Sequence, residues 1–320
     1  WGGLNDVLRN QEYNNGLLSS NVSFGSVLGI TNITTKASEY RKGTRISYAS
    51  SNRSYVHRLM ATYASGVLKN NWAFTFSGSK RSGIEGFNGG TSYNAHSLFI
   101  AAEKIINNNH SVNFTTFFAP NRRGKSSANT QEVYDLKGID YNEYWGYLNG
   151  KKINSRIKEV VEPILILNHY WDITKGTSLQ TNISYQFGKI GNSRLDFNSG
   201  ANPSATYWQL LPSFFLKDND LTEAYKARAN FENNGQLNWN RIFDANSVNN
   251  SLGLENSYVL YEDRVDDRQL NLNTIFKKTI NENILFNAKV SYSNLISDSF
   301  AEIIDLLGGT KYLDVNNFAD

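Results

Sequence analysis

The feature that most constrains this chain is a two-residue alternation of apolar and polar side chains, repeated in long segments of the sequence. The segment 72–77 has an aromatic residue at every second position, and the segment 179–187 repeats the pattern with Gln, Asn and Ser as its polar set. Successive side chains of a β-strand point to opposite faces, so the alternation predicts two-faced strands. Segments of about 9 to 11 such residues are longer than ordinary soluble strands and fit a transmembrane β-barrel.

A barrel strand presents one face to lipid and the other to the lumen, and polar side chains cannot be left in hydrocarbon. The residues predicted to face lipid are Trp72, Phe74, Phe76, Leu179, Ile183 and Phe187, and those predicted to face the lumen are Thr75, Ser77, Gln180, Asn182 and Ser184.

The connections between these strands alternate between short and long, which is typical of barrels with tight periplasmic turns and long extracellular loops. Short turns are predicted near 66–71, 107–109, 174–176 and 281–283, and long loops near 81–95, 120–157 and 189–267. About nine strands are predicted, near 44–50, 55–65, 72–80, 97–106, 111–119, 160–173, 178–188, 269–280 and 284–293. An odd antiparallel set cannot close without an unpaired edge, so further strands are expected after Asp320.

The composition supports a large β structure and excludes several classes of function. Aromatic residues make up 13% of the 320 residues, and there is no cysteine, which excludes a disulfide framework, a thiolate metal site and a cysteine nucleophile. The 32 Lys and Arg residues and 29 Asp and Glu residues are spread along the chain, which gives little support for nucleic-acid binding. The most apolar stretches, 164–167 and 303–307, are far shorter than the roughly 20 residues of a spanning helix.

Several motifs that resemble functional sites are better explained by a structural role or by chance. The four histidines are scattered without the spacing of a metal-binding helix, and the glycine-rich segment 83–90 lacks the Lys-Ser or Lys-Thr of a phosphate-binding loop. No Ser, His and Asp set forms a persuasive triad, although triad members lie far apart in sequence and the absence is weak evidence. The chain is not predicted to be an enzyme, and no cofactor is predicted. Asp220 with Glu223 predicts a capping box at the start of a short helix that continues through Ala227.

The most suggestive constellation is a group of aromatic residues in the loop 120–157, because amphipathic rings offer a ligand both a stacking surface and hydrogen bonds. The alternative is that these rings pack the loop onto itself or lie in an aromatic girdle. The cluster comprises Tyr134, Tyr141, Tyr144, Trp145 and Tyr147. The residues predicted to contact a ligand or partner are Tyr141, Tyr144, Trp145 and Trp208.

The segment before the first strand has short runs broken by glycine instead of two-faced alternation. Its residues 28–36, Leu-Gly-Ile-Thr-Asn-Ile-Thr-Thr-Lys, resemble the end of the plug domain of TonB-dependent outer-membrane receptors, although Thr31 replaces the usual apolar residue. Residues 1–7, Trp-Gly-Gly-Leu-Asn-Asp-Val, resemble a late plug segment of Bacteroidota members of that family. The stretches 202–213, 238–246, 263–266 and 307–309 are similar to loops of large Bacteroidota receptors.

The resemblance implies an all-β fold in which residues 1–38 end a plug domain and residues 39–320 form the first part of a barrel that the family builds from about 22 strands. It implies location in the outer membrane, contact with its lipid, and coupling to the TonB system in the periplasm. A nutrient ligand would bind outside, with a surface lipoprotein lid or other complex subunits as further partners. The chain begins without an initiator Met and reads as an excerpt, with any TonB-contacting segment expected before Trp1.

Three hypotheses follow from the sequence. The first is a TonB-dependent transporter that takes up a large nutrient through a plugged barrel. The second keeps the barrel but gives it a structural role, in which long loops anchor the partners of a secretion or assembly complex. The third is a soluble β-rich binding module.

Overall fold

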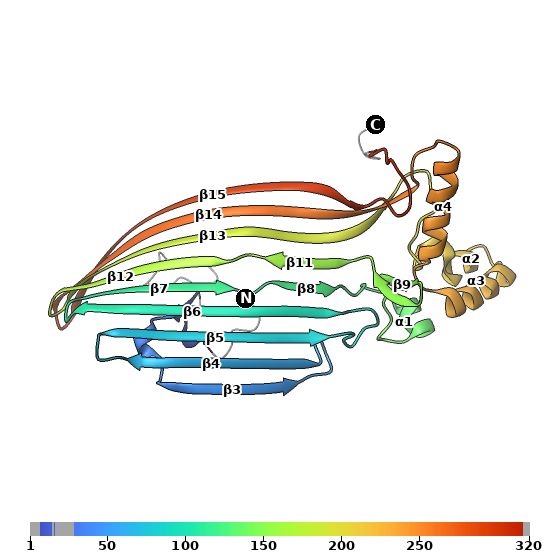
Figure 1. The fold of residues 1–320 in the computed structure, drawn as a ribbon. Coiled ribbons are helices and arrows are strands. Elements are labelled where there is room, and N and C mark those ends of the chain that lie inside the picture. Colours follow the sequence, from blue (N-terminus) through green and yellow to red (C-terminus); the bar gives the residue numbers. More distant parts are fainter. Residues whose placement is uncertain (1–6, 15, 17–28, 316–320) are drawn as a thin grey trace.

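The wall of the molecule is one curved antiparallel sheet whose strands follow its long axis (Figure 1). The computed structural model describes residues 7–14, 16 and 29–315. In this part of the chain the 11-stranded sheet makes nine passes, since two passes are each interrupted at a proline. The strands are β3 (Gly43–Ser50), β4 (His57–Val67), β5 (Trp72–Gly83), β6 (Tyr93–Asn107), β7 (His110–Phe118), β8 (Asn121–Gly124), β11 (Ile157–Val161), β12 (Ile164–Thr174), β13 (Thr177–Phe197), β14 (Tyr258–Asn281) and β15 (Ile284–Asp305).

Successive passes pair with one another in an up-and-down order, which confirms the predicted all-β fold, a partial antiparallel barrel. Short turns at 68–71, 108–109, 175–176 and 282–283 join the strands at one end of the sheet, as predicted. Within the described residues, β3 and β15 each have one neighbour, so the sheet is open at both edges.

The two interruptions lie side by side in the wall. β7 and β8 are separated at Pro120, and β11 and β12 are separated at Pro163. Proline has no N–H to donate to a ladder, but its carbonyl still accepts. The Pro120 carbonyl accepts from the His96 N–H at 3.1 Å and the Pro163 carbonyl from the Phe187 N–H at 3.2 Å, so each interrupted pass stays joined to its neighbour.

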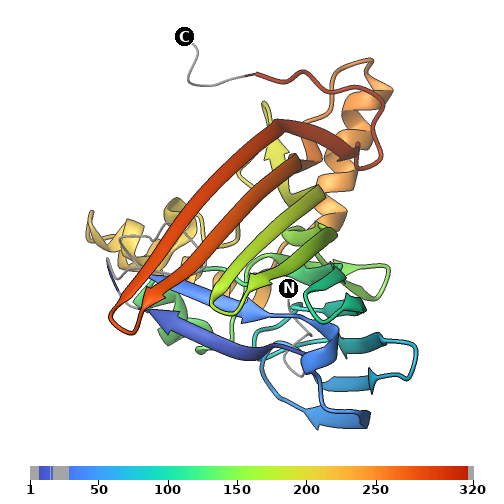
Figure 2. The ribbon, with the colours of Figure 1, turned by 90° about the vertical axis from the view of Figure 1, so that its left-hand side faces the viewer.

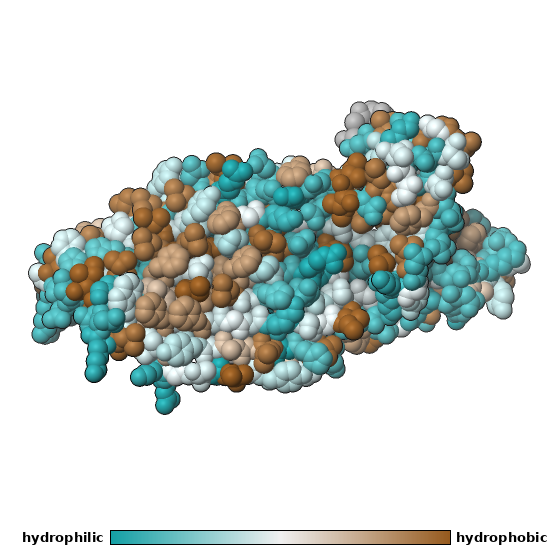
Figure 3. All heavy atoms as spheres, viewed as in Figure 1, coloured by the Kyte–Doolittle hydropathy of each residue, from teal (hydrophilic) through white to brown (hydrophobic). Residues whose placement is uncertain are grey.

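The two faces of the sheet differ as the alternation predicts. Phe76, Ile183 and Phe187 are 42%, 41% and 39% exposed on the convex face, whereas Thr75 and Ser77 on the concave face are 0% and 3% exposed. Apolar residues gather over the half of the sheet that carries the short turns, and a hydrophilic band lies beyond it (Figure 3). This is the arrangement of a lipid-facing belt with a polar extension outside it.

The strands are longer than predicted, which shortens the predicted long loops. β5 continues to Gly83, β6 starts at Tyr93, β13 ends at Phe197 and β14 starts at Tyr258. The bounds 81–95, 120–157 and 189–267 were therefore too wide, and the observed connections are 84–92, 125–156 and 198–257. Beyond the apolar belt both faces are polar, so the alternation disappears although backbone pairing continues.

A short hairpin lies on the concave side of the sheet (Figure 2). It is formed by β1 (Arg9–Asn14) and β2 (Ile30–Thr34), and the 3₁₀ turn η1 (Ala37–Glu39) connects it to the wall. The Ala37 N–H donates to the Asn113 side chain at 3.1 Å, and the Ser38 N–H donates to Glu103 at 2.9 Å. Because Asn113 and Glu103 are buried, these bonds fix the point at which the chain enters the wall. Residues 1–6, most of the segment that resembles a late part of the plug, lie outside the described residues.

The long connections carry helices that project beyond one end of the sheet (Figure 1). The connection 125–156 holds α1 (Gln131–Lys137) and the hairpin β9 (Trp145–Leu148) and β10 (Lys151–Asn154), and the connection 198–257 holds η2 (Trp208–Leu210), α2 (Pro212–Leu216), α3 (Leu221–Asn234) and α4 (Trp239–Ser251). The predicted cap is confirmed, since the Asp220 side chain accepts from the Glu223 N–H at 3.0 Å, but the helix runs past Ala227 to Asn234. Among the described helices, none has the length and apolar character to cross a bilayer.

Candidate functional site

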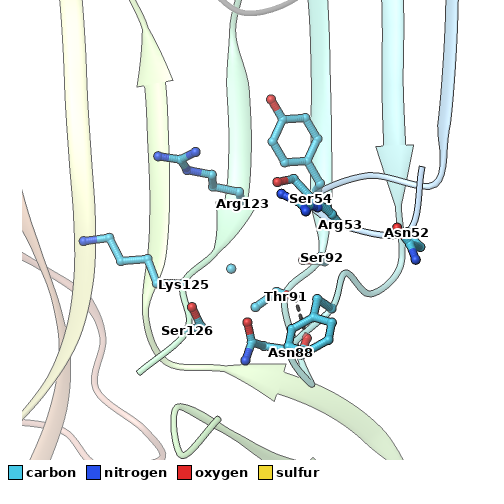
Figure 4. A pocket seen from close by; sticks show the side chains of 12 residues that line it. Asn52, Arg53, Ser54, Asn88, Thr91, Ser92, Arg123, Lys125 and Ser126 are labelled. Atoms are coloured by element: carbon cyan, nitrogen blue, oxygen red, sulfur yellow. Dashed lines mark hydrogen bonds between the residues drawn. The ribbon is translucent and has the colours of Figure 1, made fainter. Parts of the chain in front are cut away.

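A cavity of about 810 Å³ opens at the end of the sheet that carries the long connections. Three segments that are distant in sequence line it: the connection from β3 to β4, the connection from β5 to β6, and the end of β8 (Figure 4). Arg123 and Lys125 lie on one side of the cavity, and Asn52, Arg53 and Ser54 lie on the other. A volume of this size is suited to a small-molecule ligand.

The pairing of the strands places the cationic side chains on the concave face. Tyr93 of β6 lies opposite Arg123 of β8, and Arg123 lies opposite Lys158 of β11. Residues directly opposite one another in an antiparallel pair share a face. Ala95, two residues after Tyr93, is buried on the concave side, so Arg123 and Lys158 also point to that side.

The cations around the cavity act on one another. Burial lowers the pKa of Lys125 below its usual value, and the positive charges of Lys158, Arg156 and Arg123 lower it further. Asp263 opposes this shift, but that carboxylate is already paired with Arg194 at 3.0 Å. The site is therefore electropositive.

Aromatic rings stand beside these cations. The Arg81 guanidinium lies 5.3 Å from the ring centroid of Tyr55, and the Tyr55 and Tyr93 rings are 6.1 Å apart. Arg156 lies 5.4 Å from the ring centroid of Tyr144, next to a smaller cavity of about 250 Å³ that both residues line. The site can therefore offer both charge and a stacking surface to a ligand.

Two asparagine side chains tie the surrounding loops together. Asn142 donates to the carbonyls of Gly89 at 2.8 Å and Lys125 at 3.1 Å. Asn154 donates to the carbonyls of Gly90 at 3.0 Å and Lys125 at 2.9 Å. Because each amide bridges two connections, the cavity wall is held by hydrogen bonds between segments far apart in sequence.

An ion pair adds to this bridging. Lys152 of the β9–β10 hairpin lies 2.8 Å from Glu85 of the β5–β6 connection. Burial alone would raise the pKa of Glu85, but the hydrogen bonds from Lys152 and from the Gly90 N–H outweigh burial and lower the pKa below its usual value. The ionised form of Glu85 is thus the form that the loops stabilise.

The structure places the four predicted contact residues in different surroundings. Tyr141 is buried, donates to the Gly235 carbonyl at 2.7 Å and packs edge-on against Phe231. Burial and the nearby Glu143 raise the pKa of the Tyr141 hydroxyl. Its role in the folded loop is to pack one long connection onto the other.

The other three predicted residues are partly or largely accessible. Tyr144 lines the smaller cavity, and Trp145 lies under the Lys152 ammonium, whose nitrogen is 4.5 Å from the ring centroid. Trp208 is 51% exposed and packs edge-on against Phe214. The structure brings Tyr144 and Trp145 together in one connection, while Trp208 lies in the other. Ligand contact at these four residues stays a prediction.

Sequence reasoning missed Arg53, Arg123 and Lys125 as site residues. Arg53 lies in a different segment from Arg123 and Lys125, and their shared position follows from strand pairing that the chain's alternation does not specify. The Arg122-Arg123-Gly124-Lys125 run was the available signal, but a short basic run is usually a solvated surface. In the described part of the chain, no group of three or more His, Asp or Glu residues is arranged to hold a metal ion.

No protein-family model matches the chain, and no curated protein matches it. Solved structures do match. The open form of the ferric-catecholate import receptor Fiu from E. coli superposes with a TM-score of 0.56 and 10% identity, over 91% of this chain and 41% of Fiu. The siderophore receptor PiuA from Acinetobacter baumannii gives 0.54 and 12%, over 92% of this chain and 36% of PiuA.

The ferripyoverdine receptor of the outer membrane of Pseudomonas aeruginosa gives a TM-score of 0.51 and 8% identity, over 86% of this chain and 31% of that receptor. This chain thus spans 41% or less of the length of these three receptors. At such low identity the likeness shows the fold. The chain has the fold of part of these receptors, with a barrel wall and a segment on its concave side.

Proposed function

We propose that this chain is part of a TonB-dependent transporter of the Bacteroidota type, which takes up a nutrient across the outer membrane. The observation that carries the proposal is the N-terminal segment on the concave side of a barrel wall. Residues 1–38 would end the plug, and residues 39–320 would form the first part of the barrel. The unpaired edges of β3 and β15 would be covered by further strands, because unpaired backbone groups are costly in lipid.

The contacts of the segment with the wall suit a plug that must be displaced. Thr35 and Thr115 hydroxyls are 3.2 Å apart, the Ala37 N–H bonds to Asn113, and Lys36 lies 3.5 Å from Glu103. Polar contacts of this kind can be exchanged for water when a segment moves. Apolar contacts accompany them, because Val7, Ala37 and Tyr40 share a buried cluster with wall residues such as Phe99. A periplasmic pull by the TonB system would therefore have to break both kinds of contact at this junction.

The topology follows from the plug. A chain that leaves the plug enters β3 from the periplasmic side, so β3 runs outward and the connections 84–92, 125–156 and 198–257 lie outside the cell. An epitope inserted after Gly150 tests this orientation, because that residue is at the exposed tip of the β9–β10 hairpin and a side chain added there would meet open space. Antibody binding to intact cells is expected. Binding only after the outer membrane is permeabilised would invert the topology.

Energised transport is tested in cells with and without the TonB system, each carrying the full-length protein. Growth or uptake on a limiting nutrient should depend on both proteins. We propose Tyr144, Trp145 and Trp208 as contacts with the ligand or with a lipoprotein lid, and Tyr141 as a residue that supports them from inside the loop. Uptake that continues without the TonB system would contradict the proposal.

A second candidate function is a barrel subunit of an outer-membrane secretion or assembly complex. The helices of the connection 198–257 favour it, because they expose several large apolar side chains to which a protein could bind. These are Leu216, Leu221, Tyr225, Val248 and Leu252, which are 48%, 71%, 74%, 57% and 66% exposed. Stoichiometric co-purification of a surface protein, without any TonB-dependent uptake, would favour this function over transport.

A further inference from the structure

Within the part of the chain that the structure describes, the cations of the 810 Å³ cavity lack the carboxylate partners that neighbouring cations have. Across the described residues, no ion pair involves Arg53, Arg123 or Lys125. In contrast, Lys152 pairs with Glu85 at 2.8 Å, and Arg194 pairs with Asp263 at 3.0 Å. An anionic ligand would therefore balance the positive charge of this cavity.

We infer that the cavity binds a multiply charged oxyanion, a molecule with carboxylate or phosphate groups, through Arg53, Arg123 and Lys125. The inference rests on the proposed function, since it names the ligand class of the same receptor. An arginine presents a planar fork of donors that matches two oxygens of a carboxylate or phosphate, and a lysine supplies a point charge. Two arginines and one lysine around one cavity provide both.

The other lining residues complete a site for such a ligand. Ser92 and Asn88 supply neutral hydrogen-bonding groups, and Phe87 and Tyr93 supply ring surface. Their combination suits an oxyanion that also carries an apolar or ring-shaped part. A bare metal ion does not fit, since the site is cationic.

The orientation of the cavity separates a soluble ligand from a lipid headgroup. Arg123 points to the concave side of the wall, whereas Arg122 pairs in register with Asn94 and Glu159 and points to the convex side. Lipid headgroup phosphates would meet Arg122, while a ligand that enters the lumen would meet Arg123. The two adjacent arginines therefore provide a matched pair for experiment.

The binding experiment uses the full-length protein in detergent at low salt, with calorimetry as the readout. Tripolyphosphate and citrate are the anionic probes, and maltotriose is the neutral probe. Both anions should bind, with affinity that falls as salt rises, and maltotriose should not compete with them. Arg123→Gln and Lys125→Gln should each weaken binding by about tenfold or more, and Arg122→Gln should change it by less than about twofold.

Two further measurements keep the result interpretable. Heat-modifiable electrophoretic mobility reports whether each variant has a folded barrel, and Arg53→Gln, in an exposed loop, tests the same site if Arg123→Gln does not fold. Repeating the titration with and without added lipopolysaccharide distinguishes the sources of phosphate. Binding without lipopolysaccharide supports a soluble ligand, and binding that requires it overturns that part of the inference.

The outcomes for the inference and for the proposed function are separate. No anion binding at millimolar concentration, or an equal loss in Arg122→Gln and Arg123→Gln, overturns the inference. TonB-dependent uptake of a neutral nutrient that is unaffected by Arg123→Gln would leave the transporter standing and remove the anion site. Site-specific anion binding in a protein without energised uptake would support the anion site and contradict the proposed transporter.

Discussion

Breaking the ion pair between Lys36 and Glu103 should loosen the junction between the N-terminal segment and the wall. The Glu103 side chain is fully buried, and its two oxygens lie 3.5 Å from the Lys36 ammonium and 2.9 Å from the Ser38 nitrogen. Removing one partner of a buried pair costs about 3–5 kcal/mol because it leaves a charge buried without compensation. Lys36 is 25% exposed, so we expect about 2 kcal/mol for Lys36→Met, below that range.

A second substitution, at Glu103, distinguishes the loss of the ion pair from other effects of Lys36→Met. Glu103→Gln removes the buried charge but keeps an oxygen that accepts from the Ser38 N–H, so it should cost only about 1 kcal/mol. In the double variant Lys36→Met with Glu103→Gln, no buried carboxylate remains without its cation. The double variant should therefore be more stable at the junction than Lys36→Met alone, which is a non-additive result.

Hydrogen exchange at the Ser38 amide measures this effect, because that N–H is protected by its bond to Glu103. A loss of about 2 kcal/mol corresponds to exchange roughly 30-fold faster in Lys36→Met. Exchange in the double variant should fall back toward that of the unsubstituted protein. If Lys36→Met changes exchange less than about threefold, or if the two effects simply add, the ion pair does not hold the junction.

Three further predictions concern the wall and the loops. Ile183→Arg should weaken folding into bilayers by about 2–4 kcal/mol, whereas Asn182→Arg on the other face should cost less than half as much, as measured by denaturant titration in vesicles; equal costs would refute the assigned faces. The pKa of Glu85 is lowered in the folded protein, so the stability that it contributes is present above its unfolded pKa and lost as pH falls through the folded value; protease cleavage of the loops should rise below a pH of about 4.5, and Lys152→Met should abolish this rise. Trp208→Ala, at an exposed position, should shift global stability by less than about 0.5 kcal/mol yet reduce ligand uptake or partner retention, and unchanged uptake and retention would exclude Trp208 as a contact.

The membrane-facing part of the wall was predictable because the environment imposes a strict pattern there. Phe76 and Ser77 lie on the faces that alternation assigned to them, and the short turn after Thr174 is where the sequence places it. In this zone lipid on one side and a polar lumen on the other select each residue. The two-residue period of the sequence therefore predicts this part of the wall.

The outer ends of the strands were less predictable because no apolar face is required beyond the membrane. Lys189 lies opposite Asp266, and Asn192 lies opposite Asp263, within continuous β13–β14 pairing. These polar residues have the composition of a loop, and only the backbone ladder identifies them as strand. The same reason explains why the helix α4, which begins at Trp239, was not anticipated.

The candidate site was almost entirely hidden from the sequence. Asn142 and Asn154 link Lys125 to the β5–β6 connection, and the Phe87 N–H of that connection donates to the Arg53 carbonyl at 2.8 Å. None of these contacts follows from a local motif. The aromatic residues were easier to notice, but burial separates Tyr141 from the accessible Trp208 only in the folded chain.

In the proposed orientation, the length of the last three strands sets how far the helices stand above the membrane. β13, β14 and β15 have 21, 24 and 22 residues, and about 9–11 residues at a tilt of about 45° cross the hydrocarbon. At about 3.4 Å per residue, the remainder lifts the helices α2, α3 and α4 roughly 30 Å above it. In the proposed orientation this helical tip is the outermost region of the described residues, so bacteriophages and antibodies would reach it before the wall, and changes that evade them would not disturb the wall in the lipid.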